Sequence, residues 1–181
     1  MSLVDDLADA TLQDRKGNPV RLGDNWADKP AVAVWVRHFG CMFCREQARE
    51  LHQHQGEIEK LGGRLVIIGC GKPEHADWFA EDVQYDGPIL VDMKRQTYKT
   101  AEMKNSIGAT FSLHTVKNAA RALKSGARQH KTMGDPWQQG GAMVIGPGNT
   151  LHYKQISDQA GDHAPVGELL DALKKAAAAT A

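Results

Sequence analysis

Residues 31–61 read AVAVWVRHFGCMFCREQARELHQHQGEIEKL, and this stretch decides the fold. It begins with six apolar residues, 31–36, which are rich in β-branched side chains and short enough to form a buried strand. After a break at residues 37–40, residues 45–61 predict a helix, because apolar side chains recur there at helical spacing among charged and amide residues. Those apolar positions are Ala48, Leu51, Ile58 and Leu61.

Two cysteines, Cys41 and Cys44, lie where this strand passes into the helix. A helix N-terminus carries unsatisfied backbone N–H groups and the positive end of the helix dipole, and both favour a thiolate over a thiol. The pKa of a free cysteine, about 8.5, can fall there by about one unit or more. We therefore expect reactive sulfur at this junction, with Cys41 near the helix N-cap as the more exposed of the two thiols.

The composition fits one domain over residues 1–181 and excludes two classes of partner. Of the 181 residues 41% are hydrophobic, so the chain can bury a core without disulfide staples. Lys plus Arg equal Asp plus Glu at 22 each, so no net field recruits nucleic acid or a membrane surface. The N-terminus has no basic region followed by an apolar core, which leads us to expect a cytoplasmic protein. Residues 1–11 are interpreted as a short helix or a loose arm, and residues 176–181 as a frayed helix end.

The segments around the central stretch predict a sheet whose strands alternate with helices. Residues 12–22 form two short extended pieces around a turn at residues 16–18, which predicts a small N-terminal hairpin. Residues 64–69 predict a second buried strand, and a strand, a helix and a strand in this order form a right-handed unit with parallel strands. Cys70 follows that second strand, so we expect it at the same edge of the sheet as Cys41 and Cys44.

The C-terminal half continues the alternation and ends in a second hairpin. Helices are predicted at residues 74–84, 93–104, 115–124 and 165–177, and strands at residues 89–92, 142–145 and 151–156. This order of elements is the layout of a thioredoxin-like α/β fold, with a central mixed sheet flanked by helices and an N-terminal β-hairpin. A Cys-x-x-Cys pair at the first strand-to-helix junction of such a unit is typical of thiol redox proteins.

Three segments are similar to the peroxiredoxin-like branch of the AhpC/TSA group within the thioredoxin superfamily. They read RHFGCMFCRE at residues 37–46, GDPWQQGGAMVI at residues 134–145 and GDH at residues 161–163. The resemblance extends over most of the chain, from Leu12 to Leu173. It implies a thioredoxin-like fold and thiol-based redox chemistry.

The resemblance leaves open which cysteine attacks first. In thioredoxins the first cysteine of the pair attacks and the second resolves, which implies Cys41 as nucleophile and Cys44 as resolver. In peroxiredoxins the attacking cysteine follows a threonine three positions earlier, and it matches Cys44, with Cys41 at the threonine position. We therefore expect Cys44 to attack a peroxide and Cys41 to attack a disulfide.

A peroxide also needs a donor that polarises its oxygen–oxygen bond as charge moves to the leaving oxygen. Arg37 and Arg45 flank the cysteine pair and are the candidates for that role. Besides the missing threonine, the sequence departs from its relatives at two further places. Residues 138–139, Gln-Gln, stand where peroxiredoxins carry an arginine, and residues 140–141, Gly-Gly, stand where thioredoxins carry a cis-proline.

We predict that Cys41 and Cys44 cycle between a dithiol and a disulfide, which makes the protein a thiol-dependent peroxidase or disulfide oxidoreductase. The oxidant would be a peroxide or a protein disulfide, and the reductant a thioredoxin-like protein or a small thiol, with no cofactor. One alternative is a thiol-dependent reductase of a particular organic peroxide or endoperoxide, which would use the same cysteines with a more apolar cleft. Another is a non-enzymatic redox sensor or interaction module with the same fold. A zinc site lacks two further ligands at suitable spacing. Relatives often pair through sheet edges or helices, so a homodimer is also considered.

Two other residues near the pair have two interpretations each. Cys70 is interpreted as a small apolar residue that ends a buried strand, with a third redox thiol as the alternative. His38 is either a neighbour that tunes a thiolate or a loop histidine in solvent. Trp35, in the middle of the apolar run, is expected in the core.

Overall fold

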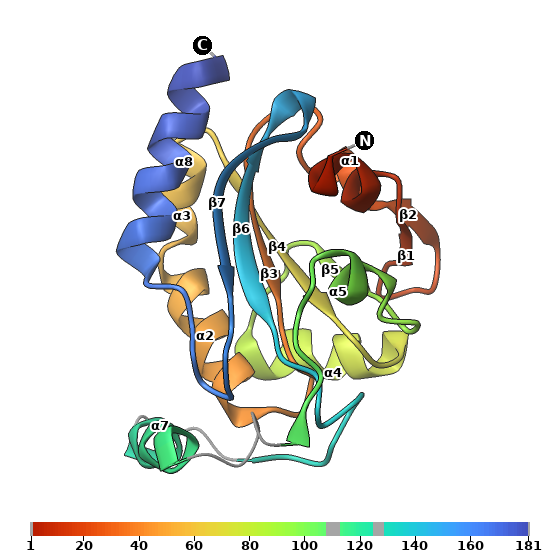
Figure 1. Ribbon diagram of the computed structural model, residues 1–181, viewed down its shortest axis with the longest axis vertical. Coiled ribbons are helices and arrows are strands. Elements are labelled where there is room, and N and C mark those ends of the chain that lie inside the picture. Colours follow the sequence, from red (N-terminus) through yellow and green to blue (C-terminus); the bar gives the residue numbers. More distant parts are fainter. Residues whose placement is uncertain (1, 108–112, 125–128, 181) are drawn as a thin grey trace.

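The computed structural model describes residues 2–107, 113–124 and 129–180, and a seven-stranded sheet forms its centre (Figure 1). Its strands are β1 (Thr11–Gln13), β2 (Pro19–Arg21), β3 (Ala31–Trp35), β4 (Arg64–Gly69), β5 (Ile89–Val91), β6 (Gly141–Gly146) and β7 (Thr150–Ile156). They lie in the order β2-β1-β5-β4-β3-β6-β7. Strand β3, from the central stretch of the sequence, therefore lies inside the sheet with neighbours on both sides.

The sheet is mixed, with a parallel centre between two hairpins. Strand β3 runs parallel to β4, and β4 runs parallel to β5. The N-terminal hairpin β1–β2 joins the sheet antiparallel to β5, and the C-terminal hairpin β6–β7 joins it antiparallel to β3. The predicted α/β fold with a mixed sheet and an N-terminal hairpin is confirmed. Parallel strands end at one edge, which brings the segments after β3, β4 and β5 together.

Helices cover both faces of this sheet. They are α1 (Leu3–Ala8), α2 (Met42–Gln53), α3 (Gln55–Lys60), α4 (Pro73–Val83), α5 (Gln96–Thr100), α7 (Leu113–Lys124) and α8 (Val166–Thr180), with 3-10 turns η1 (Leu22–Asn25) and η2 (Pro147–Asn149). Helices α2, α3, α4 and α8 contribute to the core on one face, and α1 and α5 to the core on the other (Figure 1). Within the described ranges no helix has the length and apolar character that a membrane crossing requires.

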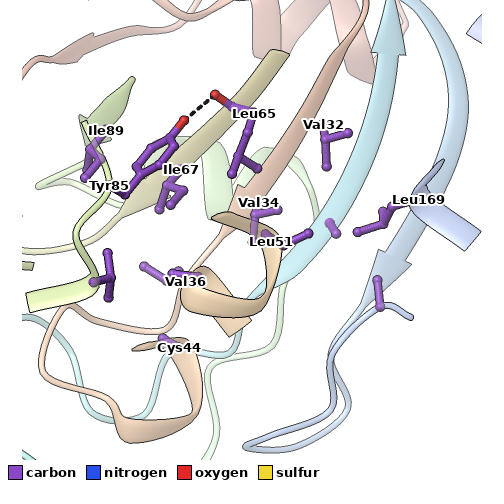
Figure 2. Packing of buried hydrophobic residues seen from close by; sticks show 14 of the residues in the cluster. Val32, Val34, Val36, Cys44, Leu51, Leu65, Ile67, Tyr85, Ile89 and Leu169 are labelled. Atoms are coloured by element: carbon purple, nitrogen blue, oxygen red, sulfur yellow. Dashed lines mark hydrogen bonds between the residues drawn. The ribbon is translucent and has the colours of Figure 1, made fainter. Parts of the chain in front are cut away.

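Strand β3 separates the two cores because its side chains alternate between the faces of the sheet. Val32 and Val34 point into the cluster shown in Figure 2, whereas Ala33 and Trp35 belong to the cluster on the opposite face. Trp35 is buried, as expected from the sequence. Because both faces of β3 are covered, the strand is an uninterrupted apolar run.

The helix expected at residues 45–61 is two helices, and the first begins earlier than predicted. Helix α2 starts at Met42 with Cys41 as its N-cap, and α3 follows after His54. His54 has φ −95° and ψ 5°, and its N–H bonds the carbonyl of Leu51, three residues back, in a tighter turn than an α-helix. The apolar spacing continues through this break, which is why the sequence suggested one helix.

The helix expected at residues 93–104 is also shorter, since α5 has only five residues. The Asp92 carboxylate accepts the N–H groups of Gln96 at 3.0 Å and Thr97 at 2.7 Å, which sets where the helix begins. Glu102 has a φ of +61°, a left-handed conformation that ends it. Two local features of the backbone therefore set the two ends of the helix, and neither can be predicted from the spacing of apolar residues.

The N-terminal segment forms the short helix and not the loose arm of the two expected alternatives, and the C-terminal end is helical up to Thr180 instead of frayed. Residues 3–8 form α1, capped by a reciprocal pair of hydrogen bonds between Ser2 and Asp5. Leu7 of this helix is fully buried. At the other end α8 continues to Thr180, and Ala176 is fully buried. Apolar contacts to the sheet hold both segments in place.

Candidate active site

The Cys-x-x-Cys pair lies in the first turn of α2, at the end of the loop that leaves β3. Cys41 is the N-cap and Cys44 is the third residue of the helix. The Cys41 N–H donates to the His38 carbonyl at 3.1 Å, which closes the loop into a tight turn. The loop requires glycine at position 40, because a Cβ there would lie 1.9 Å from the Lys131 carbonyl oxygen.

Arg37 contacts both sulfur atoms of the pair. Its backbone N–H donates to Cys44 Sγ at 3.2 Å, and its guanidinium Nη1 donates to Cys41 Sγ at 3.4 Å. Two backbone carbonyls fix the guanidinium from the other side: that of Gln138 accepts from Nε at 3.1 Å and that of Pro136 accepts from Nη2 at 2.6 Å. The structure therefore brings the predicted residues Arg37, Cys41 and Cys44 together.

The contacts of Cys41 favour its thiolate. A hydrogen bond from the Cys44 thiol and the positive charge of Arg37 lower the pKa of Cys41 to about 6, although burial acts against them. The pKa of Cys44 is raised, first because burial disfavours a charged thiolate and then because Cys41 beside it already carries the negative charge. At neutral pH the pair therefore shares one proton, and the negative charge lies on Cys41.

Both sulfur-bearing residues are buried, so the expectation that Cys41 is the more exposed is wrong. Cys41 is 0% exposed and Cys44 is 2% exposed. Residues 129–133 cover the loop: the carbonyl of Gly40 accepts the Gln129 side-chain amide at 3.1 Å and the N–H of His130 at 3.3 Å. The Phe39 N–H donates to the Met133 carbonyl at 3.2 Å. This second backbone segment, distant in sequence, closes over the N-cap.

Arg45, the other predicted arginine, lies in a different environment. Its guanidinium forms two hydrogen bonds of 2.7 Å with the carboxylate of Asp82 on α4 and lies 5.3 Å from the centre of the Trp78 ring. Trp78 also packs on His130, with the ring centres 4.4 Å apart. Among the described residues, Arg37 and not Arg45 forms hydrogen bonds with the sulfur atoms, and Arg45 links α2 to α4.

Cys70 lies at the same edge of the sheet, as expected. Its thiol donates to the carbonyl of Arg37 at 2.9 Å, and its sulfur accepts the N–H of Asp135 at 3.4 Å. Burial raises the pKa of Cys70 to about 11, so Cys70 is a neutral thiol at neutral pH. All three cysteines are free in the structure. Through its hydrogen bond to the Arg37 carbonyl, Cys70 helps to hold the backbone of Arg37 in place.

Two histidines are close enough to Arg37 for its charge to act on them. His38 is buried rather than in solvent, its Nδ1 has no hydrogen-bond partner among the described residues, and burial together with the Arg37 charge lowers its pKa to about 4. Burial, with the charges of Arg121 and Arg37, lowers the pKa of His163 to about 3. Both imidazoles are therefore neutral at pH 7. No role for His163 was predicted, although GDH at residues 161–163 is one of the family-like segments. No group of three His, Cys, Asp or Glu side chains in the described ranges could hold a metal ion.

Comparison with known proteins identifies the family. The family described as AhpC/TSA antioxidant enzyme matches residues 50–159, a region that begins after the Cys-x-x-Cys pair. The thioredoxin-like protein AAED1, chloroplastic, of Arabidopsis thaliana is 32% identical over 178 residues, covering 93% of this chain and 72% of that protein. Peroxiredoxin-like 2C of Bos taurus is 28% identical over 174 residues, covering 91% and 76%.

A solved structure agrees with these sequence matches. Peroxidoxin BcpB from Mycobacterium tuberculosis superposes with a TM-score of 0.69 at 19% identity, covering 93% of this chain and 94% of that one. At that identity the likeness shows a shared thioredoxin-like fold. With the family match and the paired thiols at the start of α2, it follows that the chain belongs to the AhpC/TSA family and is a peroxiredoxin-like, thiol-dependent redox enzyme.

Proposed function

We propose that the protein reduces peroxides, with Cys41 as the attacking thiolate and Cys44 as the resolving thiol. One observation carries this assignment: Arg37 Nη1 contacts Cys41 Sγ at 3.4 Å, and this charge and the Cys44 thiol favour a thiolate on Cys41. The assignment replaces the expectation that Cys44 attacks a peroxide. That expectation rested on alignment with the peroxiredoxin pattern, whereas the dithiol's electrostatics favour the other sulfur.

In the first step the Cys41 thiolate attacks one oxygen of a peroxide. A sulfur–oxygen bond forms, the oxygen–oxygen bond breaks, and an alkoxide or hydroxide leaves and takes a proton from solvent. Cys41 is thereby oxidised to a sulfenic acid. The Arg37 guanidinium is adjacent to the attacking sulfur, so its N–H groups can stabilise the charge that develops on the leaving oxygen.

In the second step Cys44 loses its proton and attacks the Cys41 sulfenic acid. The new sulfur–sulfur bond displaces hydroxide, which becomes water with that proton. Oxidation of Cys41 removes the negative charge beside Cys44, and this charge is one cause of the raised pKa of Cys44. The first step therefore prepares the second. One dithiol reductant, or two molecules of a small thiol, then donates two electrons and two protons by thiol–disulfide exchange and restores the pair.

The partners and the compartment belong to this proposal. The substrate is hydrogen peroxide or an organic hydroperoxide, and the reductant is a thioredoxin-like protein or a small thiol. The cycle requires a reducing compartment, and we propose the cytoplasm. A homodimer is a further expectation, which light scattering of the purified protein checks directly.

Single-turnover oxidation tests the assignment. The reduced protein, Cys41→Ser and Cys44→Ser each receive one equivalent of hydrogen peroxide, and mass mapping with a sulfenic-acid trap locates the product. We expect a Cys41–Cys44 disulfide in the native protein, sulfenic acid on Cys41 in Cys44→Ser, and slow reaction in Cys41→Ser. Fast oxidation of Cys44 in Cys41→Ser would instead support the peroxiredoxin pattern.

Disulfide exchange is the second candidate activity, because a Cys-x-x-Cys dithiol at a helix N-terminus suits either oxidant. If all three proteins react with peroxide no faster than a free thiol, the peroxidase proposal is wrong. Reduction of insulin disulfides then tests the exchange activity with the same variants. Sustained turnover with a thiol reductant in either assay distinguishes an enzyme from a redox sensor.

A further inference from the structure

One peptide bond, between Val36 and Arg37, connects the Cys44 sulfur to a buried tyrosine. Its N–H donates to Cys44 Sγ at 3.2 Å, and its carbonyl accepts the Tyr98 hydroxyl at 2.5 Å. Val36 and Cys44 are both labelled in the cluster of Figure 2, whereas Tyr98 belongs to the core on the other face of the sheet. One peptide group thus forms two hydrogen bonds, one with Tyr98 on one face of the sheet and one with the Cys44 sulfur on the other face.

Tyr98 is held firmly in this position. It is fully buried on α5, and its hydroxyl lies 3.3 Å from a second acceptor, the carbonyl of Ile68. The Asp92 carboxylate accepts the N–H of Thr97 at 2.7 Å, and the Thr97 hydroxyl accepts the Trp35 indole N–H at 2.9 Å. These bonds fix α5 against Trp35 at the end of β3 and against Asp92 after β5, so the hydroxyl stays directed at the Val36 carbonyl.

We propose that Tyr98 is a positioning residue of the thiol reaction, whose hydroxyl orients and polarises the Val36–Arg37 peptide so that its N–H stabilises negative charge on Cys44. In a chain of hydrogen bonds each donor strengthens the next one, and burial increases the effect. Tyr98 acts through the peptide and contacts no reacting atom. The proposal rests on the proposed function for the step concerned, in which Cys44 attacks the Cys41 sulfenic acid.

Other charged groups also act on the Cys44 thiol, and they determine which parent protein is suitable for a test. The Cys41 thiolate disfavours a second negative charge, and the Arg37 guanidinium favours it. Tyr98 is the titratable group of α5 that acts on Cys44, through the Val36–Arg37 peptide, and burial raises its pKa far above the ordinary value, so it remains a proton donor. In a Cys41→Ser protein the opposing charge is gone, and Arg37 and Tyr98 are left to stabilise the Cys44 thiolate.

The test measures the pH dependence of Cys44 alkylation by iodoacetamide in Cys41→Ser, with mass mapping of each cysteine. We expect Tyr98→Phe to move the midpoint upward by about half a unit, which slows alkylation about threefold at pH values below the midpoint. The midpoint is used because a loosened structure changes the alkylation rate at all pH values and leaves the midpoint in place. This readout requires no peroxide, so it is independent of whether Cys41 attacks first.

Tyr85→Phe is the matched control. Tyr85 is 2% exposed and donates its hydroxyl to the Leu65 carbonyl at 2.7 Å, so this variant also loses one buried bond to a carbonyl (Figure 2). We expect its midpoint to equal that of Cys41→Ser alone. Equal midpoints for the Tyr98 and Tyr85 variants would overturn the proposal.

A second variant covers the case in which Tyr98→Phe does not fold. A fluorinated tyrosine at position 98 keeps the ring and the hydroxyl and makes the hydroxyl a stronger donor. We expect it to lower the midpoint of Cys44 alkylation, the opposite direction to Tyr98→Phe. An unchanged or raised midpoint with this side chain would contradict a polarising role for Tyr98.

Discussion

The guanidinium Nη1 of Arg37 lies 3.4 Å from the sulfur of Cys41, with two backbone carbonyls holding the same guanidinium from behind. The arginine is thus positioned before any substrate binds, which is the condition under which a charged donor stabilises a transition state most effectively. Peroxiredoxins supply an arginine from the segment before their late strand, where this chain has Gln138 and Gln139. Here the arginine comes from the strand end that leads to the cysteines, and the late segment supplies carbonyl groups that orient it.

The reactivity of Cys41 should extend well below the pH range of an ordinary thiol. With its pKa lowered to about 6, Cys41 is about nine-tenths thiolate at pH 7. The rate of oxidation by hydrogen peroxide should therefore change little from pH 8 to pH 7 and fall as the pH drops through 6. Stopped-flow measurements of the first oxidation step in the native protein, which keeps the Cys44 thiol as a donor to Cys41, check this. A half-maximal rate near pH 8.5 would contradict the assignment of the thiolate to Cys41.

Replacing Arg37 by Met should raise the pKa of Cys41 and slow its oxidation. The variant removes both the positive charge and the Nη1 donor to Cys41 Sγ. Loss of one such donor reduces rates by about 100-fold in comparable sites. Arg37→Lys keeps the positive charge but lacks the planar guanidinium, so its oxidation rate should lie between those of the native protein and Arg37→Met. Single-turnover kinetics at several pH values separate the loss of thiolate from the loss of the donor.

Arg49→Met is a suitable control for that experiment. Arg49 also lies on α2, and its guanidinium bonds the Asp82 carboxylate at 2.6 Å, with 38% of its side chain exposed. A change in net charge alone would affect both variants alike. An equal loss of rate in Arg37→Met and Arg49→Met would therefore contradict a specific role for Arg37.

Arg45 should matter more for stability than for chemistry. Its side chain is 8% exposed and pairs with Asp82 through two hydrogen bonds, which join α2 to α4. A double-mutant cycle with Arg45→Met and Asp82→Asn should give a coupling energy of about 1–3 kcal/mol in denaturant unfolding. Arg45→Met should slow peroxide reduction far less than Arg37→Met. A coupling energy near zero would show that the ion pair does not hold the two helices together.

The N-terminal helix should be part of the folding unit. Leu7 is 0% exposed and lies in the core on the α5 side of the sheet, so Leu7→Ala should destabilise the protein by about 2–5 kcal/mol. Asp6→Ala, on the exposed side of the same helix, is the control and should change the free energy of unfolding by less than about 0.5 kcal/mol. Similar values for both variants would mean that α1 is only loosely attached.

The centre of the sheet could be predicted because its strands are apolar runs bounded by turn residues. Strands β3, β4 and β6 lie where continuous apolar runs predicted them, and β7, which is mixed in composition, was predicted as the second strand of a hairpin from the turn residues before it. Helix limits were less predictable, because single backbone conformations set them. His54 divides one apolar periodicity into two helices, and Asp92 and Glu102 confine α5 to five residues.

The site was predictable in its residues and less so in its geometry. Cys41, Cys44 and Arg37 are close in sequence and occupy one loop, so spacing alone placed them together. The pairing of Arg45 with Asp82 and the hydroxyl of Tyr98 behind Val36 depend on how distant elements pack. The burial of Cys41 has the same origin, since the covering segment 129–133 is far away in the chain.

The covering segment should control access to Cys41, and Gln129 is the side chain through which to test this. Its amide donates to the Gly40 carbonyl at 3.1 Å and its carbonyl oxygen accepts the Met42 N–H at 3.4 Å, so it closes the segment over the N-cap of α2. Since Cys41 is 0% exposed, a reagent reaches it only when this closure opens. Gln129→Ala should therefore increase the rate of Cys41 alkylation by a bulky maleimide several-fold, while the pH midpoint of the reaction stays that of the native protein. Gln129→Glu keeps the acceptor and loses the donor, so it should lie between the two. Equal rates in all three proteins would mean that substrates enter by another route, and a shifted midpoint would mean that Gln129 acts on the thiolate itself.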